Sequence, residues 1–128
     1  MSIQSPLARA RGLGSAKDGV GHWWAQRVSA VALVPLTFWF VFSIAAQAGS
    51  GGDAMIVWIA SPVSAVLLVL YMAAVFYHSQ LGLQVVVEDY VHHEGLKLFT
   101  LLALQFANIL LAAGAIFSVL YIALGGGR

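Results

Sequence analysis

One histidine and one glycine lie a single helical turn apart inside a long apolar stretch of this sequence. His78 is followed four residues later by Gly82, and the surrounding segment 54–87 contains no Asp, Glu, Lys or Arg. In a helix, residues four apart share a face. A glycine there leaves room for a flat, wide ligand beside the helix, and histidine is a common ligand of haem iron. The pair therefore favours a haem site; the alternative is a neutral His78 that hydrogen-bonds a neighbouring helix.

The depth of His78 in this stretch fits the same interpretation. His78 precedes Asp89 by 11 residues, which is roughly 16 Å along a helix and returns to the same face. A hydrocarbon core of about 30 Å then places His78 near the middle of a membrane. Haem in redox membrane proteins commonly has two axial ligands. Because we expect His22, His92 and His93 near the membrane surface, the second ligand should come from another protein chain.

Three further polar residues lie where predicted helices would meet the membrane surface. Arg27 precedes the first apolar stretch; its guanidinium could bind carboxylates such as haem propionates, or it could simply anchor the helix end. Asp89 and Tyr90 follow the second stretch. A phenol beside a carboxylate could hydrogen-bond a quinone carbonyl and relay protons, although acidic residues and tyrosine are also ordinary at a membrane boundary.

Positioning these residues requires helices that cross a bilayer. The chain has 128 residues, of which 61% are hydrophobic and 9% charged, whereas soluble domains carry about 25% charged residues. Segments 28–52, 54–87 and 98–127 contain no charged side chain, and about 20 apolar residues span a membrane once. The expected fold class is all-α integral membrane, with three transmembrane helices. A net charge of +1 argues against nucleic-acid binding, and the absence of cysteine excludes thiol chemistry.

Turn signals set the predicted helix boundaries within one domain over residues 1–128. A Gly-rich run should end the first helix. The second helix should begin at Ser61-Pro62, with Ser61 as its N-cap and Pro62 at its first helical position. The apolar residues 54–60 before that pair should form a lead-in at the outer membrane interface. Pro35 should bend the first helix. The predicted helices cover about 24–46, 62–87 and 96–124, and Gln105 and Asn108 share a face of the third that should hydrogen-bond neighbouring helices.

Basic residues set the predicted orientation. Lys97 lies between the second and third charge-free segments, and the connection between the first and second helices has no Lys or Arg. Four basic residues precede the first charge-free segment: Arg9, Arg11, Lys17 and Arg27. The positive-inside rule then places the N-terminus and the turn at 88–95 in the cytoplasm and the C-terminus outside it. Residues 1–23 should be a short cytoplasmic tail, with a mitochondrial presequence as the alternative.

Two segments resemble one protein family. Residues 78–91 combine His78, Gly82 and the pair Asp89-Tyr90, which resembles the signature of the smaller hydrophobic membrane anchor of succinate dehydrogenase, respiratory complex II. Residues 15–30 are similar to the N-terminal motif of the alphaproteobacterial type of that family. Three spans, length and orientation also agree, so the resemblance covers nearly the whole chain.

The resemblance implies a multi-pass membrane anchor in a bacterial inner membrane, with its C-terminus in the periplasm, that is not an enzyme on its own. Its helices would join a larger bundle with a companion cytochrome b-type anchor and would share haem b with it. His78 would be one axial ligand of the haem iron, Gly82 would pack against the haem, and Arg27 would lie near the propionates. Tyr90 would hydrogen-bond ubiquinone, supported by Asp89. The other implied partners are the iron–sulfur subunit, the flavoprotein subunit and the lipid bilayer.

A small proton-coupled transporter is the alternative function, with His78, Glu88 and Asp89 as its proton relay. Such a transporter would carry an essential charge within a span. Both carboxylates here lie at the predicted membrane boundary, which favours the anchor function, in which electrons from succinate oxidation would reach quinone.

Overall fold

The computed structural model of this chain describes residues 16–126 and contains three long helices and one short one within that range. The three long helices are each long and apolar enough to cross a membrane. The predicted all-α membrane fold with three spans is therefore confirmed. Residues 1–15 of the predicted tail lie outside the described range. The four helices are α2 (Ala16–Gln47), α3 (Gly52–Ala60), α4 (Pro62–Tyr90) and α5 (Glu94–Ala123).

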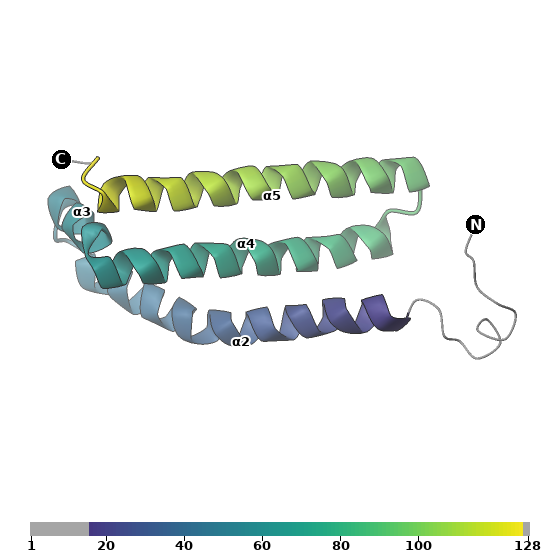
Figure 1. Cartoon of the computed structure of the whole chain (residues 1–128), viewed down its shortest axis with the longest axis horizontal. Coiled ribbons are helices and arrows are strands. Elements are labelled where there is room, and N and C mark those ends of the chain that lie inside the picture. The colour runs from purple at the N-terminus through teal and green to yellow at the C-terminus, as the bar shows by residue number, and fades with distance from the viewer. Residues whose placement is uncertain (1–15, 127–128) are drawn as a thin grey trace, which may run out of the picture.

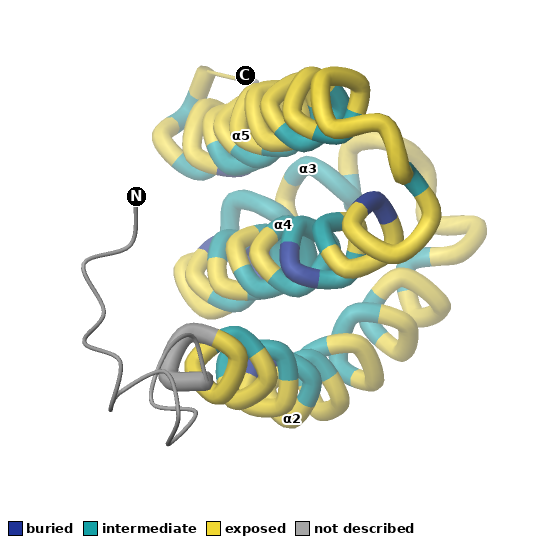
Figure 2. Tube along the Cα trace, turned by 90° about the vertical axis from the view of Figure 1, so that its right-hand side faces the viewer, coloured by how far each residue is buried: buried dark blue, intermediate teal, exposed yellow. Residues whose placement is uncertain are grey.

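The long helices lie side by side with α4 in the middle (Figure 1). α4 packs against α2 on one side and against α5 on the other, while α3 contacts α4 and α5. Seen along the helices, α2, α4 and α5 form a single row (Figure 2). Neighbouring helices run in opposite directions, so the start of α2, the end of α4 and the start of α5 meet at one end of the row (Figure 1). His22, Arg27 and the C-terminal turns of α4 therefore share that end.

The helices extend beyond the boundaries that the sequence predicts. α2 begins at Ala16, α4 continues to Tyr90 and α5 begins at Glu94. We predicted these ends where the apolar residues end, but polar residues can continue the backbone hydrogen bonding of a helix once it leaves the hydrocarbon. His93 caps the start of α5, since its Nδ1 accepts a hydrogen bond from the Leu96 backbone N–H at 3.4 Å. The turn predicted at 88–95 is therefore reduced to residues 91–93.

The connection between α2 and α4 is more helical than predicted. The expected lead-in at 54–60 lies within a helix, α3, which ends immediately before Ser61. The Ser61 hydroxyl donates to the Trp58 carbonyl oxygen at 2.9 Å, and α4 begins at Pro62 with Ser61 as its N-cap, as the Ser-Pro pair predicts. Pro35 lies inside α2, and α2 is curved in Figure 1 where α4 and α5 are nearly straight, which agrees with the bend expected there.

Most large apolar side chains face outward from this chain. Five hydrophobic residues of the described part are buried, and none of them is fully buried and large. Three of these, Ala65, Leu68 and Val119, form a small core with Trp39 and Trp58 packed against it. Exposed apolar surface on this scale marks contact with lipid or with other proteins. The outward-facing side chains of the three long helices therefore suit contact with lipid or with other proteins.

One polar contact joins α4 and α5. The Asn108 side-chain amide donates to the Phe76 carbonyl oxygen at 2.6 Å, as predicted for the polar face of α5. Gln105 is exposed, so its predicted contact would have to be with a helix of another protein chain.

Candidate functional site

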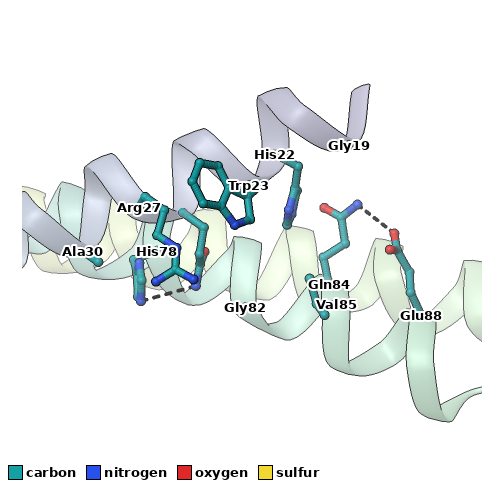
Figure 3. A pocket seen from close by; sticks show the side chains of 11 residues that line it. Gly19, His22, Trp23, Arg27, Ala30, His78, Gly82, Gln84, Val85 and Glu88 are labelled. Carbon is teal, nitrogen blue, oxygen red and sulfur yellow. Dashed lines mark hydrogen bonds between the residues drawn. The ribbon is translucent and has the colours of Figure 1, made fainter. Parts of the chain in front are cut away.

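A groove of about 730 Å³ lies between the first turns of α2 and the last turns of α4 (Figure 3). Its size is within the range of about 300–1,000 Å³ that is typical of ligand sites. α4 lines it with His78 and Gly82, and α2 lines it with His22, Gln26 and Arg27, among others. The structure therefore brings together three of the predicted site residues, His78, Gly82 and Arg27, from two helices.

Gly82 keeps this groove open. A Cβ at this position would meet only the Gln26 Nε2 atom, at 3.6 Å, which is an ordinary contact distance. An alanine would therefore fit within this chain, and the close packing of α2 on α4 does not require a glycine here. What the glycine provides is space beside His78, as a flat ligand would need.

Two residues of α2 hold the His78 imidazole. Its Nδ1 lies 2.9 Å from the Ser29 hydroxyl oxygen, and its Nε2 lies 3.4 Å from the Gln26 amide nitrogen. The Ser29 hydroxyl also donates to the Gln26 backbone carbonyl oxygen at 3.1 Å. Neither Gln26 nor Ser29 was predicted as a site residue from the sequence. They could have been identified as two polar side chains three residues apart near the start of an apolar helix.

The contacts of His78 fit a neutral imidazole that carries its proton on Nδ1. The Gln26 carbonyl can only accept, so the Ser29 hydroxyl proton is used there. In this arrangement the Ser29 oxygen accepts a hydrogen bond from an Nδ1–H of His78, 2.9 Å away. Nε2 is left as an acceptor toward the Gln26 amide. A neutral imidazole whose Nε2 carries a lone pair is the form that ligates metal ions.

The rim of the groove carries a cation. The Arg27 guanidinium carbon lies 5.4 Å from the centroid of the Trp23 ring, a cation–π distance. Both side chains line the groove, and the Trp23 ring is 54% exposed. A guanidinium held over an aromatic face at the edge of the groove can bind the carboxylates of a ligand there.

His22 lies in the same groove as His78, which the sequence did not predict. We expected His22 near the membrane surface, a half-helix away, but it is one turn from Gln26, and Gln26 contacts His78. The Nε2 of His22 and the Oε1 of Gln26 are buried and have no hydrogen-bond partner within the described residues. An unpaired buried polar atom costs about 1–3 kcal/mol, so a polar group of a ligand placed here would be stabilised.

The described part of the chain has no group of three or more His, Asp or Glu side chains that could hold a metal ion. The groove can therefore offer an axial ligand to an iron that a porphyrin already holds. It cannot build a complete metal site from these residues.

Asp89 and Tyr90 do not join the groove. Both are exposed in the last turn of α4, Tyr90 at 79%. The carboxylate that lines the groove is that of Glu88, which accepts a hydrogen bond from the Gln84 amide at 2.8 Å (Figure 3). The chain therefore separates the His78 groove from the residues predicted to contact quinone.

Comparisons with known proteins match nearly the whole chain to one family. The family model described as succinate dehydrogenase/fumarate reductase transmembrane subunit matches residues 1–122. The succinate dehydrogenase hydrophobic membrane anchor subunit of Rickettsia bellii is 30% identical over 119 residues, which cover 93% of this chain and 95% of that protein. The protein of the same name from Paracoccus denitrificans is 30% identical over 125 residues, which cover 98% and 96%. No solved structure matches this chain significantly.

Proposed function

This chain belongs to the family of succinate dehydrogenase/fumarate reductase transmembrane subunits, and we propose that its groove holds haem b while the end of α4 contributes to a ubiquinone site. The chain is a hydrophobic membrane anchor of succinate dehydrogenase, a non-catalytic subunit that works with the other subunits of that enzyme. A proton-coupled transporter finds no support among its relatives.

The position of His78 in the groove is the observation that carries the haem proposal. Its Nδ1 lies 2.9 Å from the Ser29 hydroxyl oxygen, and its Nε2 has only a 3.4 Å contact with the Gln26 amide nitrogen. Nε2 is therefore available as an axial ligand, and ligation would replace the Gln26 contact. Gly82 leaves the space beside the imidazole, and Arg27 at the rim would bind the propionates. A bound haem would supply a one-electron carrier inside the membrane.

The rest of the haem pocket would come from the companion cytochrome b-type anchor, including the second axial ligand. Two features of the chain support this. The groove lies open between α2 and α4, and most large apolar side chains of the chain are exposed. The flavoprotein and iron–sulfur subunits would complete the enzyme on the cytoplasmic side of a bacterial inner membrane.

The orientation in that membrane follows from the charged residues. Arg27 and Lys97 lie at the end of the row where α2 and α5 begin, and the opposite connection, 48–51, has no Lys or Arg. We place the N-terminus in the cytoplasm and the C-terminus in the periplasm on this basis. The end of α4, with Asp89 and Tyr90, then faces the soluble subunits.

Tyr90 would hydrogen-bond a ubiquinone carbonyl, and Asp89 would orient the phenol or pass protons from water. Both side chains are exposed in this chain, so surfaces from the iron–sulfur subunit and the companion anchor would close the site around them. A neutral phenol can donate to a carbonyl without burying a charge.

Purification of the tagged chain from its native membranes in mild detergent tests the proposed function. We expect the flavoprotein, the iron–sulfur protein and a second hydrophobic protein to co-purify, with a b-type reduced-minus-oxidised spectrum and succinate:ubiquinone reductase activity. A colourless homo-oligomer without these partners would refute the proposal.

Gly82→Leu should lower the haem content of this complex. The leucine side chain would project into the space beside His78, and overpacking of this kind typically costs about 1–3 kcal/mol, so haem affinity should fall about tenfold or more. Haem per complex, measured as the pyridine haemochrome, is the readout. Gly82→Ala should lower haem content less than Gly82→Leu, because it adds only one methyl group, whose contact within this chain is Gln26 Nε2 at 3.6 Å.

The control for this substitution is Gly114→Leu on α5, where nothing lies within 4 Å of an added Cβ. It adds the same side chain away from the groove and should leave haem content unchanged. If Gly82→Leu binds haem as tightly as Gly114→Leu does, the space beside Gly82 is not used by the haem.

A further inference from the structure

We infer that Ser29 is a positioning residue for the haem ligand: its hydroxyl fixes the tautomer and the ring orientation of His78, and through them the affinity and reduction potential of the haem. The inference rests on the proposed haem site and assigns a role within it to a residue of a different helix.

The burial of Ser29 is the first support for this role. Ser29 is 7% exposed, and only Ser29 and Ser64 are buried polar residues within the described part of the chain. Ser64 is explained locally, because its hydroxyl shares a 2.8 Å hydrogen bond with the Ser61 hydroxyl at the start of α4. Ser29 instead contacts His78, 49 residues away and on another helix, at 2.9 Å.

The direction of the hydrogen bonds is the second support. A serine inside a helix usually donates back to a carbonyl of the preceding turn, and Ser29 does so to Gln26. With that bond made, the Ser29 oxygen can accept the Nδ1–H that a neutral His78 carries when its Nε2 ligates iron. A serine with only a local role would not need to face an imidazole, so the second bond requires its own explanation.

Two consequences follow for an iron bound at Nε2. A histidine ligand that donates its other ring N–H to an acceptor is a stronger electron donor to the metal, which stabilises the ferric state and lowers the reduction potential. The same bond fixes the plane of the imidazole relative to α2. Loss of such a partner typically weakens metal affinity about 10–100-fold.

Ser29→Ala in the complete enzyme complex tests this inference. We expect haem affinity to fall about tenfold or more and the haem midpoint potential in an optical redox titration to become more positive. The low-spin ferric EPR signal should move to a different maximal g value, because the imidazole plane is no longer fixed. A purely structural serine would change none of these spectroscopic readouts.

Ser29→Thr provides the rescue. Threonine keeps the hydroxyl, and its extra methyl group has space, because Ser29 also lines a second cavity of about 630 Å³ beside Ala25, Ala32 and Ala74. The threonine variant should therefore keep the wild-type potential and EPR signal. The matched control is Ser118→Ala, which removes a hydroxyl that donates within its own helix to the Gly114 carbonyl oxygen at 2.8 Å.

The outcomes separate this inference from the proposed function. A wild-type complex without haem overturns both. A haem-containing wild-type complex whose potential and EPR signal are unchanged in Ser29→Ala overturns only the role of Ser29. If Ser29→Ala does not assemble, Ser29→Cys replaces it, since a thiol has similar volume and accepts only weak hydrogen bonds; a shift in the same direction supports the inference, and an unchanged potential overturns it.

Discussion

His78→Ala should remove the b-type haem from the succinate dehydrogenase complex. Loss of an outer partner of a metal ligand typically costs about 10–100-fold in affinity, so loss of the ligand itself should cost more. The reduced-minus-oxidised spectrum and the haem content of the purified complex measure the effect.

Two exposed histidines of this chain provide the control. His92 and His93 lie between α4 and α5 and are both exposed, so His92→Ala and His93→Ala should keep the full b-type spectrum. Succinate oxidation with a dye that accepts electrons from the soluble subunits should survive in all three variants if they assemble. An unchanged spectrum in His78→Ala would exclude His78 as a haem ligand.

The three membrane spans could be predicted because charged side chains are rare in the hydrocarbon core of a membrane. A charge inside it is expensive, so the charge-free segments 28–52, 54–87 and 98–127 delimit the helices that the structure contains. Their ends could not be predicted in the same way. α2 starts at Ala16 and α4 continues through Glu88 to Tyr90, because helical hydrogen bonding is compatible with polar residues where the membrane ends.

The candidate site could be predicted only on the helix that carries His78. His78 and Gly82 are conspicuous because they are close in sequence and lie in an apolar stretch. Ser29 and Gln26 contact His78 across 49 and 52 residues, and their contact depends on how α2 is rotated and shifted against α4. That packing is a property of two helices together, and no local pattern in either helix encodes it.

The position of His22 also depends on how α2 and α4 pack together, so the sequence alone did not predict it. Counting residues along α4 predicts a depth for His78, but it cannot relate that depth to positions on α2. In the structure, α2 begins early and runs antiparallel to α4, so His22 reaches the groove that His78 lines. Asp89 keeps the helical spacing from His78 on which its prediction was based, because α4 continues to Tyr90. The carboxylate that lines the groove is nevertheless that of Glu88.

Tyr90→Phe should reduce ubiquinone reductase activity about tenfold or more while leaving folding and haem unchanged. Tyr90 ends α4 and is 79% exposed, so losing its hydroxyl removes no contact within the described part of this chain. A hydrogen bond contributes about 0.5–1.5 kcal/mol, and more where negative charge develops on the acceptor, as on a quinone oxygen during reduction. Steady-state succinate:ubiquinone reductase activity, compared with dye-coupled succinate oxidation, is the measurement.

Tyr121→Phe is the matched control, because Tyr121 is also an exposed tyrosine but lies near the end of α5, at the opposite end of the row. It removes the same hydroxyl far from the proposed quinone site and should leave both activities at the wild-type level.

Asp89→Asn should lower quinone reduction in the same assay, since it keeps the side-chain shape and removes the carboxylate that orients the phenol or carries protons.

If Tyr90→Phe reduces ubiquinone at the wild-type rate, the hydroxyl does not contact the quinone. Tyr90 would then be a residue of the aromatic belt at the membrane surface, and the quinone site would belong to the other proteins of the complex.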